Sequence, residues 1–271
     1  MITRTGYIGL GNIGREIALN VLRGGFDLMV YDLRQEPLDE FAALGAKIAH
    51  SPKEVGAHAE LVELSVVDDA QVEAAILGEG GVLEGAHPGL IVAVHSTMHP
   101  DTVRRVAAKA KEHGVEVIDA APSRTSEAAP PRFLSYMIGG DPDLVERCRP
   151  VFETSAAHIF NVGGVGTGVT AKLAQQVITT VTLLGVSEGR RMAAAAGMDL
   201  EVFRQVVAVS SAQSHMADRH LTDVPVKKAN PERDGWYQGI IPAARLAHDL
   251  GVSVPAAALF QQRIPEVFGW D

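Results

Sequence analysis

The sequence contains a single cysteine, Cys148, among 271 residues. One thiol excludes an internal disulfide and a metal site built from several cysteines, and this usage fits a reducing cytosol. Basic residues are also few, because 24 Lys and Arg stand against 33 Asp and Glu, which gives a net charge of −9. No basic stripe interleaved with aromatic residues offsets that charge. The composition therefore argues against a nucleic-acid-binding protein and favours small metabolites as partners.

The chain has no uncharged apolar stretch that approaches the length of a membrane span, and it contains no repeat or low-complexity segment. Met1-Ile2-Thr3-Arg4 leads straight into the first predicted strand, without the apolar segment of a signal peptide. We therefore expect a globular cytoplasmic protein with no membrane partner. Its length is sufficient for one large domain or two ordinary ones.

Two common kinds of catalytic centre are also missing. His95 and His99 lie four residues apart, but Pro100 and the turn between them prevent a shared helical face, and no further ligand lies at suitable spacing. We therefore expect no metal. The chain also lacks the nucleophile elbow of a Ser-His-Asp hydrolase.

Glycine, in contrast, is abundant, and its most informative cluster lies between a short apolar run and a helical stretch near the N-terminus. This order predicts a strand, a turn and a helix whose N-terminus binds a dinucleotide pyrophosphate. Gly9 permits the tight turn, Gly11 lets the backbone approach the phosphates, and Gly14 lets the helix pack closely on the strand. The predicted cofactor-binding residues of this turn are Gly9, Gly11, Asn12, Ile13 and Gly14.

A second apolar run ends at Asp32, eighteen residues after Gly14, where the acid that binds a ribose hydroxyl belongs. A carboxylate there accepts hydrogen bonds from the 2′-OH and repels a 2′-phosphate, which favours NAD over NADP. Arg34 lies two residues further on, where a guanidinium is able to meet a phosphate instead. The sequence thus predicts a site for NAD, with NADP as the less favoured cofactor.

Strand-like and helix-like segments alternate through the first 160 residues, which is typical of a parallel sheet covered on both faces. Its ligand crevice should lie at the carboxyl ends of the strands. The ends of the third and fourth major strands, Val66 to Asp69 and His95 to Thr97, should line that crevice, so Val66, Val67 and Thr97 are further cofactor-binding candidates. The predicted strands are 3–8, 27–31, 60–66, 90–94, 115–119, 133–138 and 157–160.

The pattern becomes wholly helical from Gly166 onward. Residues 169–197 read as one long helix without an internal proline, and shorter helical segments are predicted at 199–207, 209–220, 240–250 and 255–266. Gly163-Gly164-Val165-Gly166 reads as a hinge-like junction. We therefore predict an NAD(P)-binding Rossmann domain over residues 1–163 and an all-helical domain for substrate binding and dimerisation over residues 164–271, joined through the long helix.

The long predicted helix is apolar nearly all round, which predicts that it is buried, so its few polar residues are candidates for a functional role. They stand three and four residues apart and form one stripe. A lysine in such a stripe either lies on a solvated face or is desolvated, and a desolvated lysine is a usable general acid or base near neutral pH. The stripe consists of Lys172, Gln175, Gln176, Thr179 and Thr180.

Five segments spread over nearly the whole chain resemble those of the β-hydroxyacid dehydrogenase family, whose members include 3-hydroxyisobutyrate dehydrogenase. The resemblance implies that Lys172 is the catalytic lysine, that the enzyme is a homodimer or homotetramer, and that Ser96 to Pro100 lie near the nicotinamide ribose. The segments are Gly9 to Gly14, Val67 to Asp69, Leu77 to Gly81, Ser96 to Pro100 and Gly166 to Lys172.

The predicted substrate segment departs from the family pattern. Where the family has glycines after Asp-Ala-Pro-Val-Ser, this chain reads Asp119-Ala120-Ala121-Pro122-Ser123-Arg124-Thr125-Ser126. The Arg-Thr-Ser version resembles the sulfolactaldehyde reductase branch, which implies that the arginine holds an anionic end of the substrate. A guanidinium suits a carboxylate, sulfonate or phosphate equally. The substrate-binding candidates are Ser123, Arg124 and Thr125.

Two further positions differ from the family. Gln175 and Gln176 stand where the family has asparagines, and the added methylene moves each amide outward by about one bond length. Gln176, one turn after Lys172, is the candidate for orienting the reacting hydroxyl. Gln238-Gly239 falls where the family has a Lys-Asp pair.

The sequence thus predicts an NAD-dependent oxidoreductase that transfers a hydride between the nicotinamide and a small 3-hydroxy acid or its semialdehyde, with the site in the cleft between domains. Lys172 acts as general acid or base and Gln176 assists it. Two alternatives stay open, motivated by the glutamines at 175, 176 and 238. One is an imine reductase or a dehydrogenase of uncharged or aromatic substrates on the same scaffold. The other is a catalytically inactive dinucleotide-binding protein.

Overall fold

A computed structural model describes residues 1–123, 131–222 and 235–268 of the chain. The chain divides into two compact units, Met1–Lys172 and Leu173–Asp271. The division falls inside one long helix, α8 (Thr167–Ala195).

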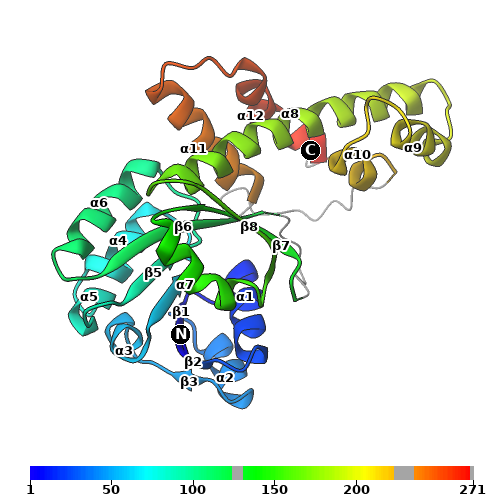
Figure 1. The fold of residues 1–271 in the computed structure, drawn as a ribbon. Coiled ribbons are helices and arrows are strands. Elements are labelled where there is room, and N and C mark those ends of the chain that lie inside the picture. The colour runs from blue at the N-terminus through cyan, green and yellow to red at the C-terminus, as the bar shows by residue number, and fades with distance from the viewer. Residues whose placement is uncertain (124–130, 223–234, 269–271) are drawn as a thin grey trace. The chain divides into compact units, whose positions relative to one another are not determined.

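The first unit contains a sheet whose strands lie in the order β3-β2-β1-β4-β5-β6-β7-β8 (Figure 1). Neighbouring strands pair in parallel except β6 and β7, which are antiparallel. The predicted parallel sheet is confirmed apart from the antiparallel β6–β7 pair. The two-residue strand β3 was too short for its pattern to be recognised. The strands are β1 (Arg4–Ile8), β2 (Asp27–Tyr31), β3 (Lys47–Ile48), β4 (Leu61–Leu64), β5 (Ile91–Val94), β6 (Glu116–Ser123), β7 (Leu134–Gly139) and β8 (Ala156–Gly163).

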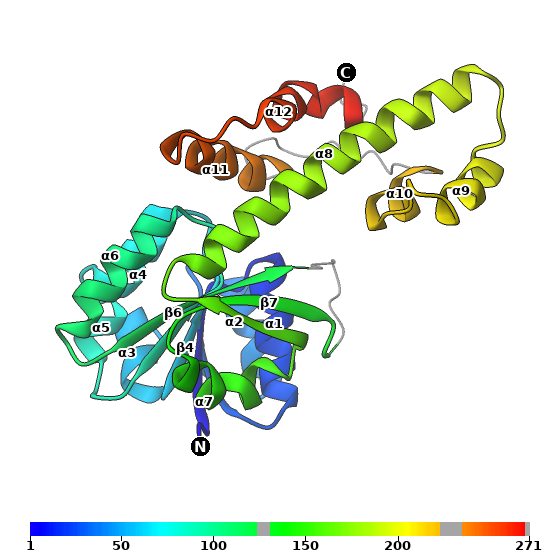
Figure 2. The ribbon, with the colours of Figure 1, turned by 45° about the horizontal axis from the view of Figure 1, so that its top comes forward.

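The central strands are apolar runs because both of their faces are covered. Every residue of β4 and β5 is buried, as expected for parallel strands between two helical layers. Helices α1, α2 and α7 share one apolar cluster with the sheet, and α3 to α6 lie on the opposite face (Figure 2). These helices are α1 (Asn12–Arg23), α2 (Gln35–Ala43), α3 (Pro52–His58), α4 (Asp69–Leu77), α5 (Val82–Gly85), α6 (Pro100–Lys111) and α7 (Pro142–Phe152).

A polar pair interrupts this core. Glu63 of β4 and His95, the residue after β5, are both fully buried at the side chain, and Oε1 of Glu63 lies 3.0 Å from Nε2 of His95. Nδ1 of His95 lies 2.6 Å from the carbonyl oxygen of Ala120, which only accepts, so this nitrogen bears a hydrogen. Each group thus has a polar partner inside the core, which reduces the cost of burying the pair. It connects β4, β5 and β6 near their carboxyl ends.

The second unit is helical throughout the part that the structure describes. Leu183 and Leu184 of α8 pack with Ile240 of α11 and Phe260 of α12 in one apolar cluster. A smaller cluster joins α9 and α10 to Val186. The helices after α8 are α9 (Leu200–Ala208), α10 (His215–His220), α11 (Gly235–Asp249) and α12 (Pro255–Phe268). The predicted helical C-terminal region with a long leading helix is confirmed.

Helix α8 is the most apolar long helix among the described residues. By length and composition it passes as a membrane span, with a mean hydropathy of 1.2 over an 18-residue window of which 28% is buried. The sequence predicts no uncharged apolar stretch of that length, and α8 contains the charged residues Lys172, Glu188 and Arg190. Long core helices of globular proteins pass the same test, and a helix that carries Lys172 and two glutamines is a poor match to lipid.

Candidate functional site

The glycine-rich turn has the geometry that its sequence predicts. Gly9 has a φ of +90°, and a Cβ on it would lie 2.1 Å from the carbonyl oxygen of Ser65. A Cβ on Gly14 would lie 2.1 Å from the carbonyl oxygen of Gly9, so α1 packs directly on the turn. Gly11, in contrast, faces open space, with no atom within 4 Å of a Cβ. The turn therefore leaves room for a ligand at Gly11, and it tolerates no side chain at the other two glycines.

The N-terminus of α1 suits a pyrophosphate. Gly11 is its N-cap and provides no side-chain hydrogen bond, and the first turn contains no acidic residue. The first N–H groups of the helix are therefore left for an external acceptor, and the helix dipole favours an anion there. The residues at this helix end fit the phosphates of a nicotinamide dinucleotide.

Asp32, the residue after β2, is fixed by two neighbours, Leu10 and Arg34. Its Oδ2 accepts the Leu10 N–H at 2.7 Å, and its Oδ1 accepts the N–H and Nε–H of Arg34 at 2.9 and 3.0 Å. Burial raises the pKa of Asp32, but the hydrogen bonds from Arg34 and Leu10 outweigh it and lower the pKa below the usual value. The carboxylate is therefore ionised at neutral pH and holds the tip of the glycine-rich turn. Arg34 also donates to the Leu10 carbonyl at 2.9 Å.

The strand order reverses between β1 and β4, and the carboxyl ends on either side of such a point form the ligand crevice of an open parallel sheet. The loop after β4 is tied to the loop after β5, because Ser96 Oγ accepts the Val66 N–H and donates to the Val66 carbonyl, both at 2.8 Å. Val67 is exposed and Thr97 is half-buried. His95 differs from its prediction, since it turns into the core toward Glu63 instead of lining the crevice.

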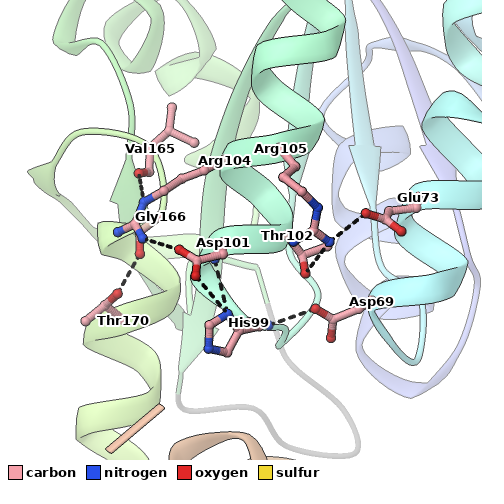
Figure 3. Close-up of polar contacts among 10 residues, drawn as sticks. All are labelled: Asp69, Glu73, His99, Asp101, Thr102, Arg104, Arg105, Val165, Gly166 and Thr170. Atoms are coloured by element: carbon pink, nitrogen blue, oxygen red, sulfur yellow. Dashed lines mark hydrogen bonds and ion pairs between the residues drawn. The ribbon is translucent and has the colours of Figure 1, made fainter. Parts of the chain in front are cut away.

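Further contacts join α4, α6 and their preceding loops (Figure 3). Asp69 Oδ1 accepts the His99 N–H at 3.1 Å, and Nδ1 of His99 accepts the Asp101 N–H at 3.3 Å, which caps α6. Arg105 donates to Glu73 at 2.8 Å. Asp68 and Asp69, which follow the third major strand, thus both stabilise local structure. Asp68 caps α4, and Asp69 holds the loop before α6.

The turn that leads into α8 is held by α6 on one side (Figure 3). Arg104 donates from Nη1 to Asp101 at 2.8 Å and from Nε to the Val165 carbonyl at 3.3 Å. Its guanidinium lies against Gly166, whose φ is +91° and whose Cβ would stand 2.8 Å from Nε. The positive φ favours glycine at 166, and the missing side chain lets the Arg104 guanidinium lie against the turn.

The same turn is held from beneath by Asp119, which is fully buried near the middle of β6. Its Oδ1 accepts the Gly166 N–H and its Oδ2 accepts the Val169 N–H, both at 2.7 Å. Burial raises the pKa of Asp119, and the hydrogen bonds from these N–H groups oppose the rise. A Cβ on Gly168 would lie 2.5 Å from the Met137 carbonyl oxygen, so the start of α8 packs directly on the sheet backbone. This role of Asp119 was not predicted from the sequence, because a residue that caps a helix far along the chain leaves no local sequence pattern.

Lys172 lies three residues after Val169, whose N–H donates to Asp119. Its side chain is half-buried, and desolvation lowers its pKa from 10.5 to about 8. An appreciable fraction of this amine is therefore neutral near physiological pH. Lys172 and Gln176 stand one helical turn apart on α8, which puts them on the same helical face.

The rest of the predicted stripe is bonded along α8. Gln175 Nε2 donates to Thr179 Oγ1 at 2.7 Å, and Thr180 Oγ1 donates to the Gln176 carbonyl at 2.9 Å. Thr180 is buried, and both glutamines and Thr179 are half-buried. Most of the stripe is therefore shielded from solvent.

The predicted substrate segment is only partly described. Ser123 is the last residue of β6, pairs with Ser135 of β7 and is half-buried. Arg124 and Thr125 lie outside the described residues, as do the side chains of residues 235–238. Among the side chains that the structure does describe, no three of His, Cys, Asp and Glu are arranged to hold a metal ion.

Comparisons with known proteins add to this geometry. Residues 4–164 match the family model for the NAD binding domain of 6-phosphogluconate dehydrogenase. Residues 166–267 match the model described as NAD-binding of NADP-dependent 3-hydroxyisobutyrate dehydrogenase. The two models together account for nearly the whole chain.

Individual relatives are similar over comparable lengths. An uncharacterized oxidoreductase of Mycobacterium tuberculosis is 33% identical, over 98% of this chain and 93% of the relative. A protein of Pseudomonas aeruginosa named NAD-dependent L-serine dehydrogenase is 32% identical, over 93% of this chain and 84% of its own. A crystal structure named 3-hydroxyisobutyrate dehydrogenase, from Salmonella typhimurium, superimposes with a TM-score of 0.81 at 25% identity, over 98% of this chain and 95% of that one.

Asp119→Asn should destabilise the first unit. An amide has one acceptor oxygen, so one of the two N–H groups at the start of α8 loses its buried partner, which costs about 1–3 kcal/mol. Urea unfolding followed by circular dichroism measures this free energy. Asp141→Asn, at the exposed N-cap of α7, is the matched control and should have little effect, because Asn caps a helix as well as Asp. Equal stability of the two variants would contradict the assigned role of Asp119.

Proposed function

Because the chain belongs to the β-hydroxyacid dehydrogenase family, and is thus an NAD(P)-dependent oxidoreductase acting on a small metabolite, we propose that its substrate is a small 3-hydroxy acid or the corresponding semialdehyde. The bound nicotinamide supplies the hydride acceptor or donor. The side chains of this protein bind the substrate, orient the reacting oxygen and move its proton.

The observation that carries the proton-transfer assignment is the lowered pKa of Lys172, to about 8. A general base of an alcohol must be neutral and a general acid of a carbonyl must be protonated, and a group with this pKa provides both forms near neutral pH. We assign the proton transfer to Nζ of Lys172. Gln176, one turn later, orients the reacting oxygen through its side-chain amide.

The cofactor assignment rests on the first unit. The turn at Gly9 and Gly11 and the end of α1 bind the pyrophosphate, and the ionised carboxylate of Asp32 binds the ribose hydroxyls and disfavours a 2′-phosphate. NAD is therefore the preferred cofactor. The full proposed set is Gly9, Gly11, Asn12, Ile13, Gly14, Asp32, Val66, Val67 and Thr97.

The anionic end of the substrate is assigned to Ser123, Arg124 and Thr125. A guanidinium forms paired hydrogen bonds with an oxyanion, and Ser and Thr hydroxyls complete such a site. The Pseudomonas aeruginosa relative is named for L-serine, which is itself a 3-hydroxy acid with a carboxylate. We extend that substrate class to this chain.

The boundary between a cofactor-binding domain over residues 1–163 and a helical domain over residues 164–271 stays a prediction.

The first experiment is NADH and NADPH oxidation with small semialdehydes that carry a carboxylate, a sulfonate or no anion, run beside Arg124→Ala. Turnover should require the anion, should be faster with NADH, and should fall about tenfold or more in the variant, because a charge-assisted pair is lost. Arg23→Ala, an exposed arginine at the end of α1, is the control and should match the wild type.

Other results of this panel would each replace the proposal. Turnover of uncharged carbonyls or imines alone, indifferent to Arg124, would favour an imine reductase or a dehydrogenase of uncharged or aromatic substrates. Tight NADH binding without any turnover would favour an inactive dinucleotide-binding protein.

Lys172→Ala should lower kcat by about 10²–10⁴-fold while the Kd for NAD stays nearly unchanged, since the amine moves a proton and does not contact the dinucleotide phosphates. In the wild type, oxidation needs the neutral amine, so its rate should rise with pH and level off above about 8. Reduction needs the protonated amine and should slow above the same pH. Lys111→Ala, at the exposed end of α6, is the control. A variant that keeps wild-type turnover and pH profile would remove Lys172 from the mechanism.

We also propose that the protein is a homodimer or homotetramer in the cytoplasm, assembled through the helical unit. Val202 and Val206 lie one turn apart on α9, and Val209 directly follows that helix; each is more than half exposed. Ile178 and Met192 of α8 are exposed as well. A second copy of the chain is the simplest cover for such apolar surface. Cell fractionation tests the location.

Light scattering should therefore give a mass of at least twice 28.8 kDa at micromolar concentration. Val206→Glu should lower that mass, because a carboxylate in an apolar interface is costly. Leu44→Glu, an equally exposed apolar residue of the first unit, should leave it unchanged. A wild-type protein of monomeric mass would refute the assembly.

A further inference from the structure

Gln176 and Gly239 lie against each other within the second unit. Helices α8 and α11, which carry them, lie side by side (Figure 2). Leu183 of α8 and Ile240 of α11 belong to one apolar cluster. A Cβ added to Gly239 would stand 2.3 Å from Nε2 of Gln176, 2.9 Å from its Cδ and 3.2 Å from its Cγ. The outer half of the glutamine side chain therefore fills the space that any side chain at position 239 would need.

Backbone conformation does not explain a glycine at this position. Gly239 lies inside α11 and is absent from the glycines with positive φ, so any L residue fits its backbone. Glycine is also a poorer helix former than alanine. The close approach of Gln176 is the feature that requires the missing side chain.

We propose that Gly239 is a positioning residue, which sets where the amide of Gln176 stands relative to Lys172 on the same face of α8. The proposal rests on the function assigned above to Gln176. The missing Cβ at Gly239 leaves the space that the terminal amide occupies, and so permits the rotamer that the long side chain adopts. A methyl group at 239 would force Nε2 to move by more than 1 Å to reach ordinary contact distance. Misplacement of a catalytic group by about 1 Å is able to cost on the order of 10²-fold in rate.

Four variants test this assignment: Gly239→Ala, Gln176→Asn, the double variant, and Gly185→Ala as the matched control. Gly185 lies on α8 in the same unit, is exposed and has no atom within 4 Å of a Cβ, so it reports on the general effect of a helical Gly→Ala change. The readouts are kcat and the KM for NAD, with the semialdehyde or 3-hydroxy acid that gives the highest turnover. Urea unfolding of each variant is measured in parallel.

Gly239→Ala should lower kcat about tenfold or more with an unchanged KM for NAD, whereas Gly185→Ala should match the wild type. Gln176→Asn alone should also lower kcat, because its amide is one methylene too short. The double variant should be no slower than Gln176→Asn, since the shorter side chain leaves room for the new methyl group. The same non-additivity should appear in the unfolding free energies.

The inference would be overturned if Gly239→Ala kept the wild-type kcat. It would also be overturned if the fold-loss of kcat in the double variant equalled the product of the two single losses. Either result would leave the proposed function intact. A wild type without turnover on any hydroxy acid or semialdehyde would instead contradict the proposed function. Additive unfolding free energies would show that the two residues do not constrain each other. These failures are distinguishable, because the stability cycle does not depend on catalysis.

Discussion

The buried carboxylate of Asp119 is the contact on which the arrangement around Lys172 depends. It joins β6 to the first turn of α8 through two charge-assisted hydrogen bonds of 2.7 Å. A carboxylate at a helix N-terminus both accepts otherwise unpaired N–H groups and interacts favourably with the helix dipole. Because Lys172 lies in the next turn of the same helix, its place over the sheet is set by this cap.

Glycines make the contact possible. Gly168 and Gly139 let the helix backbone approach β6 and β7, where a side chain on either would collide with backbone atoms. Gly166 adopts a positive φ beneath the guanidinium of Arg104. The junction that reads as a hinge from its glycines is thus tied to α6 and to β6 in the structure. Composition alone does not distinguish a flexible glycine segment from a closely packed one.

The cofactor end of the first unit follows a similar principle, in which charged groups hold loops and leave helix N–H groups available. Asp32 secures the tip of the glycine-rich turn through Leu10, and Ser96 joins the loops after β4 and β5. The end of α1 has no competing cap. The buried pair of Glu63 and His95 supports β4, β5 and β6 behind these loops. Fixed loops and an open helix end favour binding of an anion without a large rearrangement.

Local sequence patterns were sufficient to predict much of the fold and of the candidate site. The glycine turn, Asp32, every strand of the sheet except β3, and the long helix with its polar stripe were predicted from residue spacing, because each depends on neighbours within about one element. The antiparallel pairing of β6 and β7, the burial of His95 and the cap from Asp119 were not. Each of these depends on residues that are 12 to 50 positions apart, which periodicity does not report.

The amino-acid sequence by itself determined the fold class and the dinucleotide-binding turn and made Lys172 a candidate for proton transfer, since short segments with fixed spacing indicate them. Tertiary structure alone decided how desolvated Lys172 is, which carboxylate caps α8, and that Gln176 lies in the space left by Gly239. Desolvation and steric fit are sums over atoms brought together by folding. They therefore have no signature in any single stretch of the chain.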